Sequence, residues 1–190
     1  RGLSYDMPPG SEALRRQIAR RSLDWGSNLT PDDLITTCGG TEALMLCLRA
    51  VTKPGDVVAG ESPTHFCVLQ AIEELGLKAL EIPMHPRDGM DVEALERAVA
   101  TRRIATCVAV PNFNNPLGSL MPDDRKQRLL EILTARGIPL IEDDIYGGLH
   151  FGPQRPRVVQ SWARPGLVMP CGSSSQTLAP GHRVGWAAPG

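Results

Sequence analysis

The stretch LITTCGGTEALMLCLRAV, residues 34–51, decides the fold class of this chain. Its first five residues are mostly apolar or β-branched, which is typical of a buried strand, and Gly39-Gly40 then breaks the pattern. From Leu44 to Val51 the apolar residues recur at the spacing of a helix. A strand, a glycine turn and a helix in direct succession indicate an α/β fold.

The same alternation continues along the whole chain. Strand-like runs are expected at residues 34–38, 57–61, 78–82, 104–110, 138–141, 167–171 and 184–188. Helical patterns are expected at residues 11–23, 64–75, 91–99 and 122–136. We therefore expect a mostly parallel, seven-stranded sheet covered by helices, in one domain that spans residues 1–190.

Length and charge limit the functions that the chain can have. With 190 residues it can form one sizeable core, and because it opens on Arg1 and stops just after a strand-like run, we expect it to be part of a longer polypeptide. The net charge of −1 favours neither a nucleic-acid nor an anionic-membrane partner. The run of Arg15, Arg16, Arg20 and Arg21 predicts the solvated face of a helix.

The five cysteines form no C-x-x-C pair, and most lie in apolar stretches. No apolar run reaches the roughly 18 residues of a membrane span, and the chain does not start with a signal peptide. These features predict a reducing, cytoplasmic setting without a membrane partner.

Two glycine- and asparagine-rich loops follow strands, where α/β sheets place their ligand sites. At the first loop, Gly40 and Thr41 open a helix, so backbone N–H groups and a hydroxyl could bind an anion, although glycine pairs are more often plain turns. The second loop, PNFNNPLG at residues 111–118, contains Asn115 and could equally be a simple turn.

The third loop, IEDDIYG at residues 141–147, carries three consecutive acids. A hard cation could use such carboxylates, but neighbouring strand residues point to opposite faces and no further ligand cluster is close in sequence. We therefore expect no metal there. In the fourth loop, CGSSSQTLAPGHRVGW at residues 171–186, Arg183 offers a permanent cation.

The four loops together resemble the large domain of fold-type I pyridoxal phosphate (PLP) proteins of the class I/II aminotransferases. The resemblance covers nearly the whole chain, and the segments YDMPPG, TTCGGTEAL, ESPT, PNFNNPLGSLMP and PLIEDDIYG are most similar to the aminotransferase-like half of MocR-type GntR transcription regulators. It implies a three-layer α/β/α domain whose last strand is antiparallel. It also implies a homodimer, an amino-acid or amine ligand, and DNA binding only through a module outside this chain.

The resemblance also assigns site residues. It implies that Asp143 holds the protonated pyridine nitrogen of PLP and that Asn115 and Tyr146 bind its phenolic oxygen. The phosphate positions are matched by Ser173, Ser175 and Arg183, together with the loop of Gly40 and Thr41.

Three positions depart from the family pattern. His65 stands where a tyrosine usually stacks on the pyridine ring, and Ser174 replaces an aromatic residue. Gln176 occupies the position of the lysine that links covalently to PLP and moves the proton during amino transfer. The other lysines, Lys53, Lys78 and Lys126, are not expected to reach the site.

Three functions remain open from the sequence. The first is a PLP-binding, ligand-sensing domain of a MocR-type regulator that does not catalyse amino transfer at enzymic rates. The second is an aminotransferase of the aminoadipate or kynurenine-like subgroup, in which Gln176 is an engineered or erroneous change. The third is a non-catalytic dimerisation module, which the retained loop residues disfavour.

Overall fold

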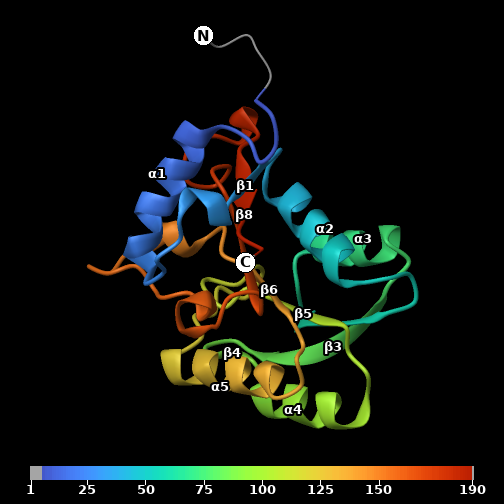
Figure 1. Ribbon diagram of the computed structural model, residues 1–190. Coiled ribbons are helices and arrows are strands. Elements are labelled where there is room, and N and C mark those ends of the chain that lie inside the picture. The colour runs from blue at the N-terminus through green and yellow to red at the C-terminus, as the bar shows by residue number, and fades with distance from the viewer. Residues whose placement is uncertain (1–5, 190) are drawn as a thin grey trace.

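The computed structural model describes residues 6–189. Within them, eight strands form one sheet in the order β1-β8-β7-β6-β5-β2-β3-β4 (Figure 1). The strands are β1 (Ile35–Thr37), β2 (Val57–Ser62), β3 (Lys78–His85), β4 (Gly89–Met90), β5 (Thr106–Ala109), β6 (Leu140–Asp143), β7 (Val168–Ser173) and β8 (Gly185–Ala187). The α-helices are α1 (Glu12–Ser22), α2 (Gly40–Val51), α3 (Phe66–Glu74), α4 (Val92–Thr101) and α5 (Asp123–Thr134).

The centre of the sheet is parallel. Strands β3, β2, β5, β6 and β7 pair in parallel, whereas β8 runs antiparallel to β7 and β1 runs antiparallel to β8. The predicted mostly parallel sheet with an antiparallel last strand is therefore confirmed. The predicted number of seven strands is wrong, because β4 pairs antiparallel with β3 through Met84 and Met90. A strand of two residues is too short to show an alternating pattern in the sequence.

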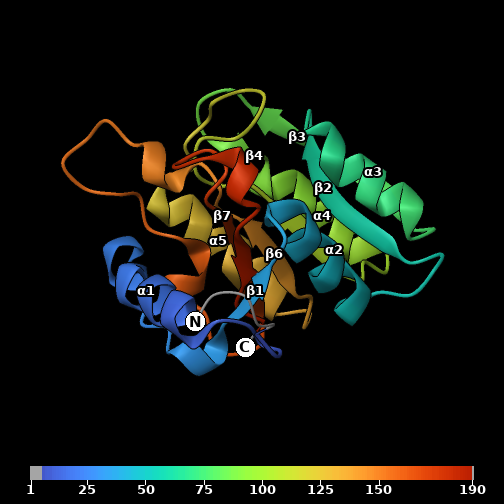
Figure 2. The same cartoon turned by 90° about the horizontal axis from the view of Figure 1, so that it is seen from above.

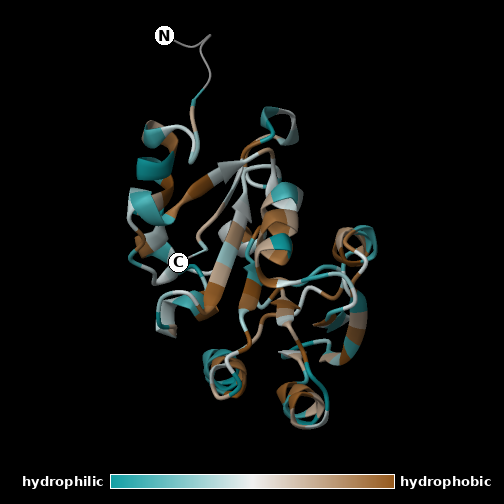
Figure 3. Cartoon of the chain, turned by 45° about the vertical axis from the view of Figure 1, so that its right-hand side comes forward, coloured by the Kyte–Doolittle hydropathy of each residue, from teal (hydrophilic) through white to brown (hydrophobic). Residues whose placement is uncertain are grey.

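Helices cover both faces of the sheet. In β5, Cys107 belongs to the buried cluster that includes side chains of α4 and α5, and Val108 belongs to the cluster that includes α2 and α3. Figure 1 shows α2 and α3 above β3 and β5 and α4 and α5 below them, and Figure 2 gives the same elements seen from above. Successive side chains of a strand point to opposite faces of the sheet. Because helices cover both faces, the inner strands are apolar on both, and they are coloured brown in Figure 3.

A third apolar cluster fixes α1 beside β8. Ile18 of α1, Leu34 and Trp25 are buried in it, and the Trp25 ring stacks on Trp186 with 5.7 Å between ring centroids. The predicted solvated arginine face is wrong for one member: Arg15 is 8% exposed. Its guanidinium group donates to the carbonyl of Gly10, just before α1, and to the carbonyl of Pro31, so its buried charge is hydrogen-bonded.

The cysteines are all free; three are buried, Cys67 is half-buried and Cys38 is exposed. No helix in the described part of the chain has the length and apolar character to cross a bilayer.

Candidate active site

A cavity of about 270 Å³ opens at the carboxyl ends of β6 and β7, next to the start of α2. The sheet positions it, because neighbouring parallel strands end at the same edge. Nine of its lining residues were singled out from the sequence: Gly40, Thr41, His65, Asp143, Tyr146, Ser173, Ser175, Gln176 and Arg183. Thus three of the four loops, together with the segment that starts α3, converge on one cavity.

One end of the cavity is suited to an anion. Gly39 adopts a left-handed φ of 90°, which turns the chain from β1 into α2. A side chain at Gly39 would lie 2.4 Å from Nη2 of Arg183, so the glycine leaves room for that guanidinium group. Arg183 donates to the Cys38 and Pro180 carbonyls and makes no ion pair with a described residue. Its charge and the start of α2 are available for a bound anion.

Two serines complete this end. The Ser173 hydroxyl donates to Oγ of Ser175 at 3.0 Å, and the Ser175 backbone N–H donates to Oγ of Ser173, also at 3.0 Å. Ser174, which was noted as a departure, hydrogen-bonds the Val184 carbonyl and does not line the cavity.

Asp143 provides an acid at the bottom of the cavity. Burial raises the pKa of its carboxyl group from the usual 3.8 to about 7. The hydrogen bond from the Ile145 N–H lowers this pKa, and the charge of Asp144 raises it. The two flanking acids each bind a different partner. Glu142 accepts the backbone N–H groups of residues 159 and 160, and Asp144 pairs with Arg155. The three acids therefore form no common site, and no group of three or more metal-ligating side chains occurs in residues 6–189.

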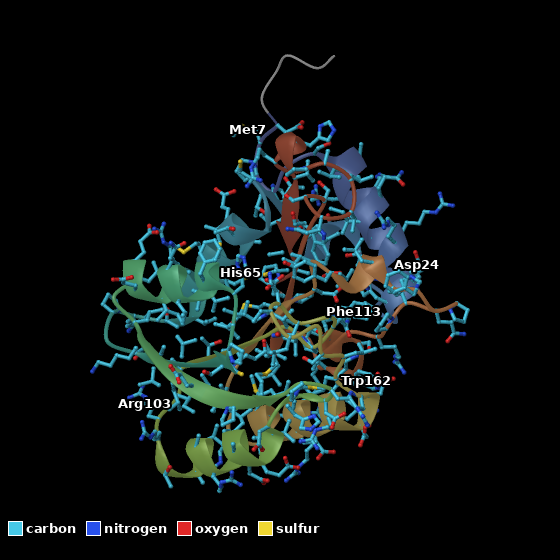
Figure 4. The ribbon with its side chains drawn as sticks, turned by 180° about the vertical axis from the view of Figure 1, so that it is seen from behind. Met7, Asp24, His65, Arg103, Phe113 and Trp162 are labelled. Atoms are coloured by element: carbon cyan, nitrogen blue, oxygen red, sulfur yellow. The ribbon has the colours of Figure 1, made fainter. Side chains whose placement is uncertain are left out.

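Asn115 does not line the cavity but is joined to it through Tyr146. Its Nδ2 donates to the phenolic oxygen of Tyr146 at 2.9 Å, which brings the loop after β5 next to the loop after β6. His65 lies at the start of α3, as labelled in Figure 4. Its Nδ1 accepts the Cys67 N–H at 3.4 Å, and its ring packs 4.4 Å from Phe66 between centroids.

Gln176 lines the cavity from its exposed side and makes no hydrogen bond with a described residue. No lysine lines this cavity among residues 6–189. Lys53 and Lys78 are exposed, whereas Lys126 is a buried residue of α5 and donates to the Arg157 carbonyl at 2.7 Å. Of the segment YDMPPG, Tyr5 lies outside the described residues.

Sequence reasoning missed Glu61, which is 4% exposed at the end of β2. Burial raises the pKa of its carboxyl group to about 8, although the Val110 N–H and the Asn114 amide lower it, while Asp143 raises it further. Asn114 Nδ2 donates to Oε2 of Glu61 at 2.6 Å and so steadies the loop that carries Asn115. The available signal was a charged residue at the end of an otherwise apolar strand.

Comparisons with known proteins agree with this arrangement. The family model "Aminotransferase class I and II" matches residues 3–188. Two Escherichia coli proteins, the uncharacterized HTH-type transcriptional regulators YjiR and YdcR, are 47% and 41% identical over 99% and 97% of this chain, which spans 40% of each. The crystal structure of the α-aminoadipate aminotransferase LysN from Thermus thermophilus, complexed with N-(5'-phosphopyridoxyl)-L-leucine, superposes with a TM-score of 0.91 at 31% identity. It is matched over 99% of this chain and 48% of its own. The chain belongs to the class I and II aminotransferase family.

Proposed function

We propose that this chain is the PLP-binding, ligand-sensing domain of a longer MocR/GntR-type transcription regulator, whose DNA contacts are made by a module outside residues 1–190. The observation that carries the proposal is that Asp143, Arg183 and Gln176 line one cavity. Asp143 suits the ring nitrogen of PLP, Arg183 suits its phosphate, and Gln176 stands at the lysine position. The similarity to two transcription regulators supports the same reading.

The residues present fit PLP. Arg183, Ser173 and Ser175 would hold its phosphate at the start of α2, where Gly40 keeps the space open: a side chain there would lie 3.3 Å from Ile145 and from Ser173. When bound, PLP supplies an electron-withdrawing ring to which an amine can be attached.

The remaining contacts would orient the ring. Asp143 would hold the proton on the ring nitrogen, since a carboxylate in a low-dielectric site favours a cationic partner. Tyr146 and Asn115, already joined at 2.9 Å, would donate to the phenolic oxygen. His65 would cover one ring face with a smaller aromatic surface than a tyrosine.

Gln176 determines what this site can do. A carboxamide can donate and accept hydrogen bonds, but it is neither a nucleophile toward the aldehyde nor a base of useful strength. No lysine lines the cavity within residues 6–189, so no described residue replaces the missing amine. We therefore expect reversible, noncovalent cofactor binding without amino transfer at enzymic rates.

Calorimetric titration with PLP and with pyridoxamine phosphate tests the proposal, with Gln176→Lys as the matched variant. We expect saturable heat with the unmodified protein but no link that survives borohydride and denaturation, and such a link at position 176 in the variant. Negligible heat with both cofactor forms would refute PLP binding. A borohydride-stable link to Lys53, Lys78 or Lys126 in the unmodified protein would refute the noncovalent mode.

The partners of the domain follow from its surface and its family resemblance. We expect an amino acid or amine as ligand and a homodimer as assembly, supported by exposed apolar side chains on α3: Phe66 is 61% and Leu69 is 48% exposed. Sedimentation equilibrium of the unmodified protein and of a Phe66→Ser variant tests the dimer, and a monomer at all concentrations would contradict it. The free cysteines favour a cytoplasmic location.

An aminotransferase is the second candidate, favoured by the match to LysN over 99% of the chain. In this case Gln176 would be an engineered or erroneous change. The sequence encoded before Arg1 distinguishes the two: a basic winged-helix segment favours the regulator, and a short helical arm favours the enzyme.

A further inference from the structure

Glu61 is a buried acid that does not line the cavity but is hydrogen-bonded to a loop beside it. Gly60 pairs with Val108, so Glu61, the next residue, lies level with the end of β5. The loop that follows β5 spans residues 110–122 and carries Phe113, which is labelled in Figure 4. Strand β2 therefore provides an acceptor for a loop that belongs to the neighbouring strand.

Asn114 is the residue through which Glu61 contacts this loop. It is 2% exposed, and its Nδ2 donates to Oε2 of Glu61 at 2.6 Å. Its Oδ1 accepts the Leu117 N–H at 3.3 Å, within the loop. Pro116 and Gly118, at the loop tip, are exposed, so packing contributes little to holding the tip. The Asn114 side chain thus joins the two ends of the tip, and Glu61 attaches it to the sheet.

Asn115, the next residue, extends this attachment to the cavity. Its Nδ2 donates to the phenolic oxygen of Tyr146 at 2.9 Å, and Tyr146 lines the cavity. Two side-chain hydrogen bonds from consecutive residues therefore connect Glu61 with the cavity wall. Because hydrogen bonds weaken steeply when their geometry is disturbed, a shift of the loop would loosen the contact between Asn115 and Tyr146.

The chemistry of Glu61 argues against a role in packing alone. Burial raises the pKa of its carboxyl group to about 8, so the group is mostly protonated at neutral pH. Its Oε1 is buried without a hydrogen-bond partner in the described part of the chain. An apolar side chain of similar size would avoid the free-energy cost of this unpaired atom. Buried acids of this kind cluster at functional sites.

We propose that Glu61 is a positioning residue of the cofactor site, which holds the loop so that Asn115 and Tyr146 meet the phenolic oxygen of PLP. This role rests on the proposed binding of PLP. Glu61 does not touch the ligand itself, because it is 4% exposed and does not line the cavity. Its contribution to affinity passes through Asn115.

A double-mutant cycle, measured by fluorescence titration with PLP at pH 7, tests this role. Glu61→Leu removes the acceptor, and Asn115→Ala removes the amide that contacts Tyr146. Each should weaken PLP binding about 2- to 10-fold, the range of one hydrogen bond. The double variant should bind no more weakly than Asn115→Ala alone, because Glu61 acts through Asn115. Losses that multiply in the double variant would show that Glu61 acts independently, and would overturn the proposal.

Two further variants separate positioning from stability. Glu61→Gln keeps an acceptor oxygen for Asn114 and, like the protonated acid, carries no charge, so it should bind PLP with nearly the affinity of the unmodified protein. Thr106→Val is the matched control, since Thr106 is also buried and its hydroxyl donates to the Pro139 carbonyl at 2.8 Å, at the opposite end of β5 from the loop. It should lower the thermal midpoint and leave PLP binding unchanged. Equal PLP affinity in Glu61→Leu and Thr106→Val would overturn the proposal.

Hydrogen exchange without cofactor measures the loop directly. Residues 111–121 should exchange faster in Glu61→Leu than in the unmodified protein, Glu61→Gln or Thr106→Val. Unchanged exchange with intact PLP binding would overturn the role of Glu61 alone. Absent PLP binding in the unmodified protein would overturn the proposed function, and this role with it. If Glu61→Leu does not fold, Asn114→Ala removes the same hydrogen bond from the loop side and takes its place in both experiments.

Discussion

Replacing Asp143 by asparagine should stabilise the protein without cofactor at neutral pH, and the gain should depend on pH. Burial raises the pKa of this carboxyl group from 3.8 to about 7 in the folded protein. Its contribution to stability is therefore complete below pH 3.8 and is lost as the pH rises through about 7. The shift of about 3 units corresponds to an upper figure of about 4 kcal/mol at pH 8, since one unit equals about 1.4 kcal/mol.

Asparagine keeps an oxygen for the Ile145 N–H but carries no charge to bury. Urea unfolding of both proteins at pH 5, 6, 7 and 8 measures the difference. We expect the advantage of Asp143→Asn to grow by about 1.4 kcal/mol per pH unit up to pH 7 and then to level off. The same variant should bind PLP about 10- to 100-fold more weakly at pH 8, because the charged partner of the ring nitrogen is lost. A stability difference that does not change with pH would refute the assigned pKa and its cause.

Three further predictions concern single contacts. Tyr146→Phe removes the phenolic hydroxyl that accepts the amide at 2.9 Å, and it should weaken PLP binding about 2- to 10-fold in a fluorescence titration. Leu133→Ala, at a fully buried core position, should cost about 2–5 kcal/mol in urea unfolding, and a loss below 1 kcal/mol would contradict the packing. Gly39→Ala and Gly55→Ala both place a side chain at a φ of 90°, so both should lower the thermal midpoint. Only Gly39→Ala displaces Arg183, so it alone should weaken phosphate binding by calorimetry; equal losses in both would show that the displacement does not matter.

The parts of the fold that follow from local pattern could be predicted from the sequence. Apolar runs and glycine breaks gave the parallel strands and their helices, since burial on both faces makes each inner strand apolar. The pairing of β3 with β4 could not be read this way, because β4 has only two residues. The burial of Arg15 was also missed, since it depends on the carbonyl of Pro31, which the sequence alone does not bring near.

For the site, the order of motifs predicted the residues that gather in the cavity, but not the residues that support them. Glu61 and the pair of Arg155 with Asp144 act through partners distant in sequence. Such features depend on tertiary contacts, which residue spacing does not encode.

The three consecutive acids at the end of β6 have a consequence for how mutations here would be tolerated. Glu142 accepts a hydrogen bond from the backbone N–H of Val159, Asp143 lines the cavity, and Asp144 pairs with Arg155. In a saturation-mutagenesis experiment, losses at Glu142 and Asp144 would register as lower abundance, and losses at Asp143 as lost binding in a protein of undiminished abundance. Three consecutive acidic residues are thus under separate selective constraints. A mutational effect averaged over the three positions would hide the effect at Asp143, which is the position that depends on the ligand.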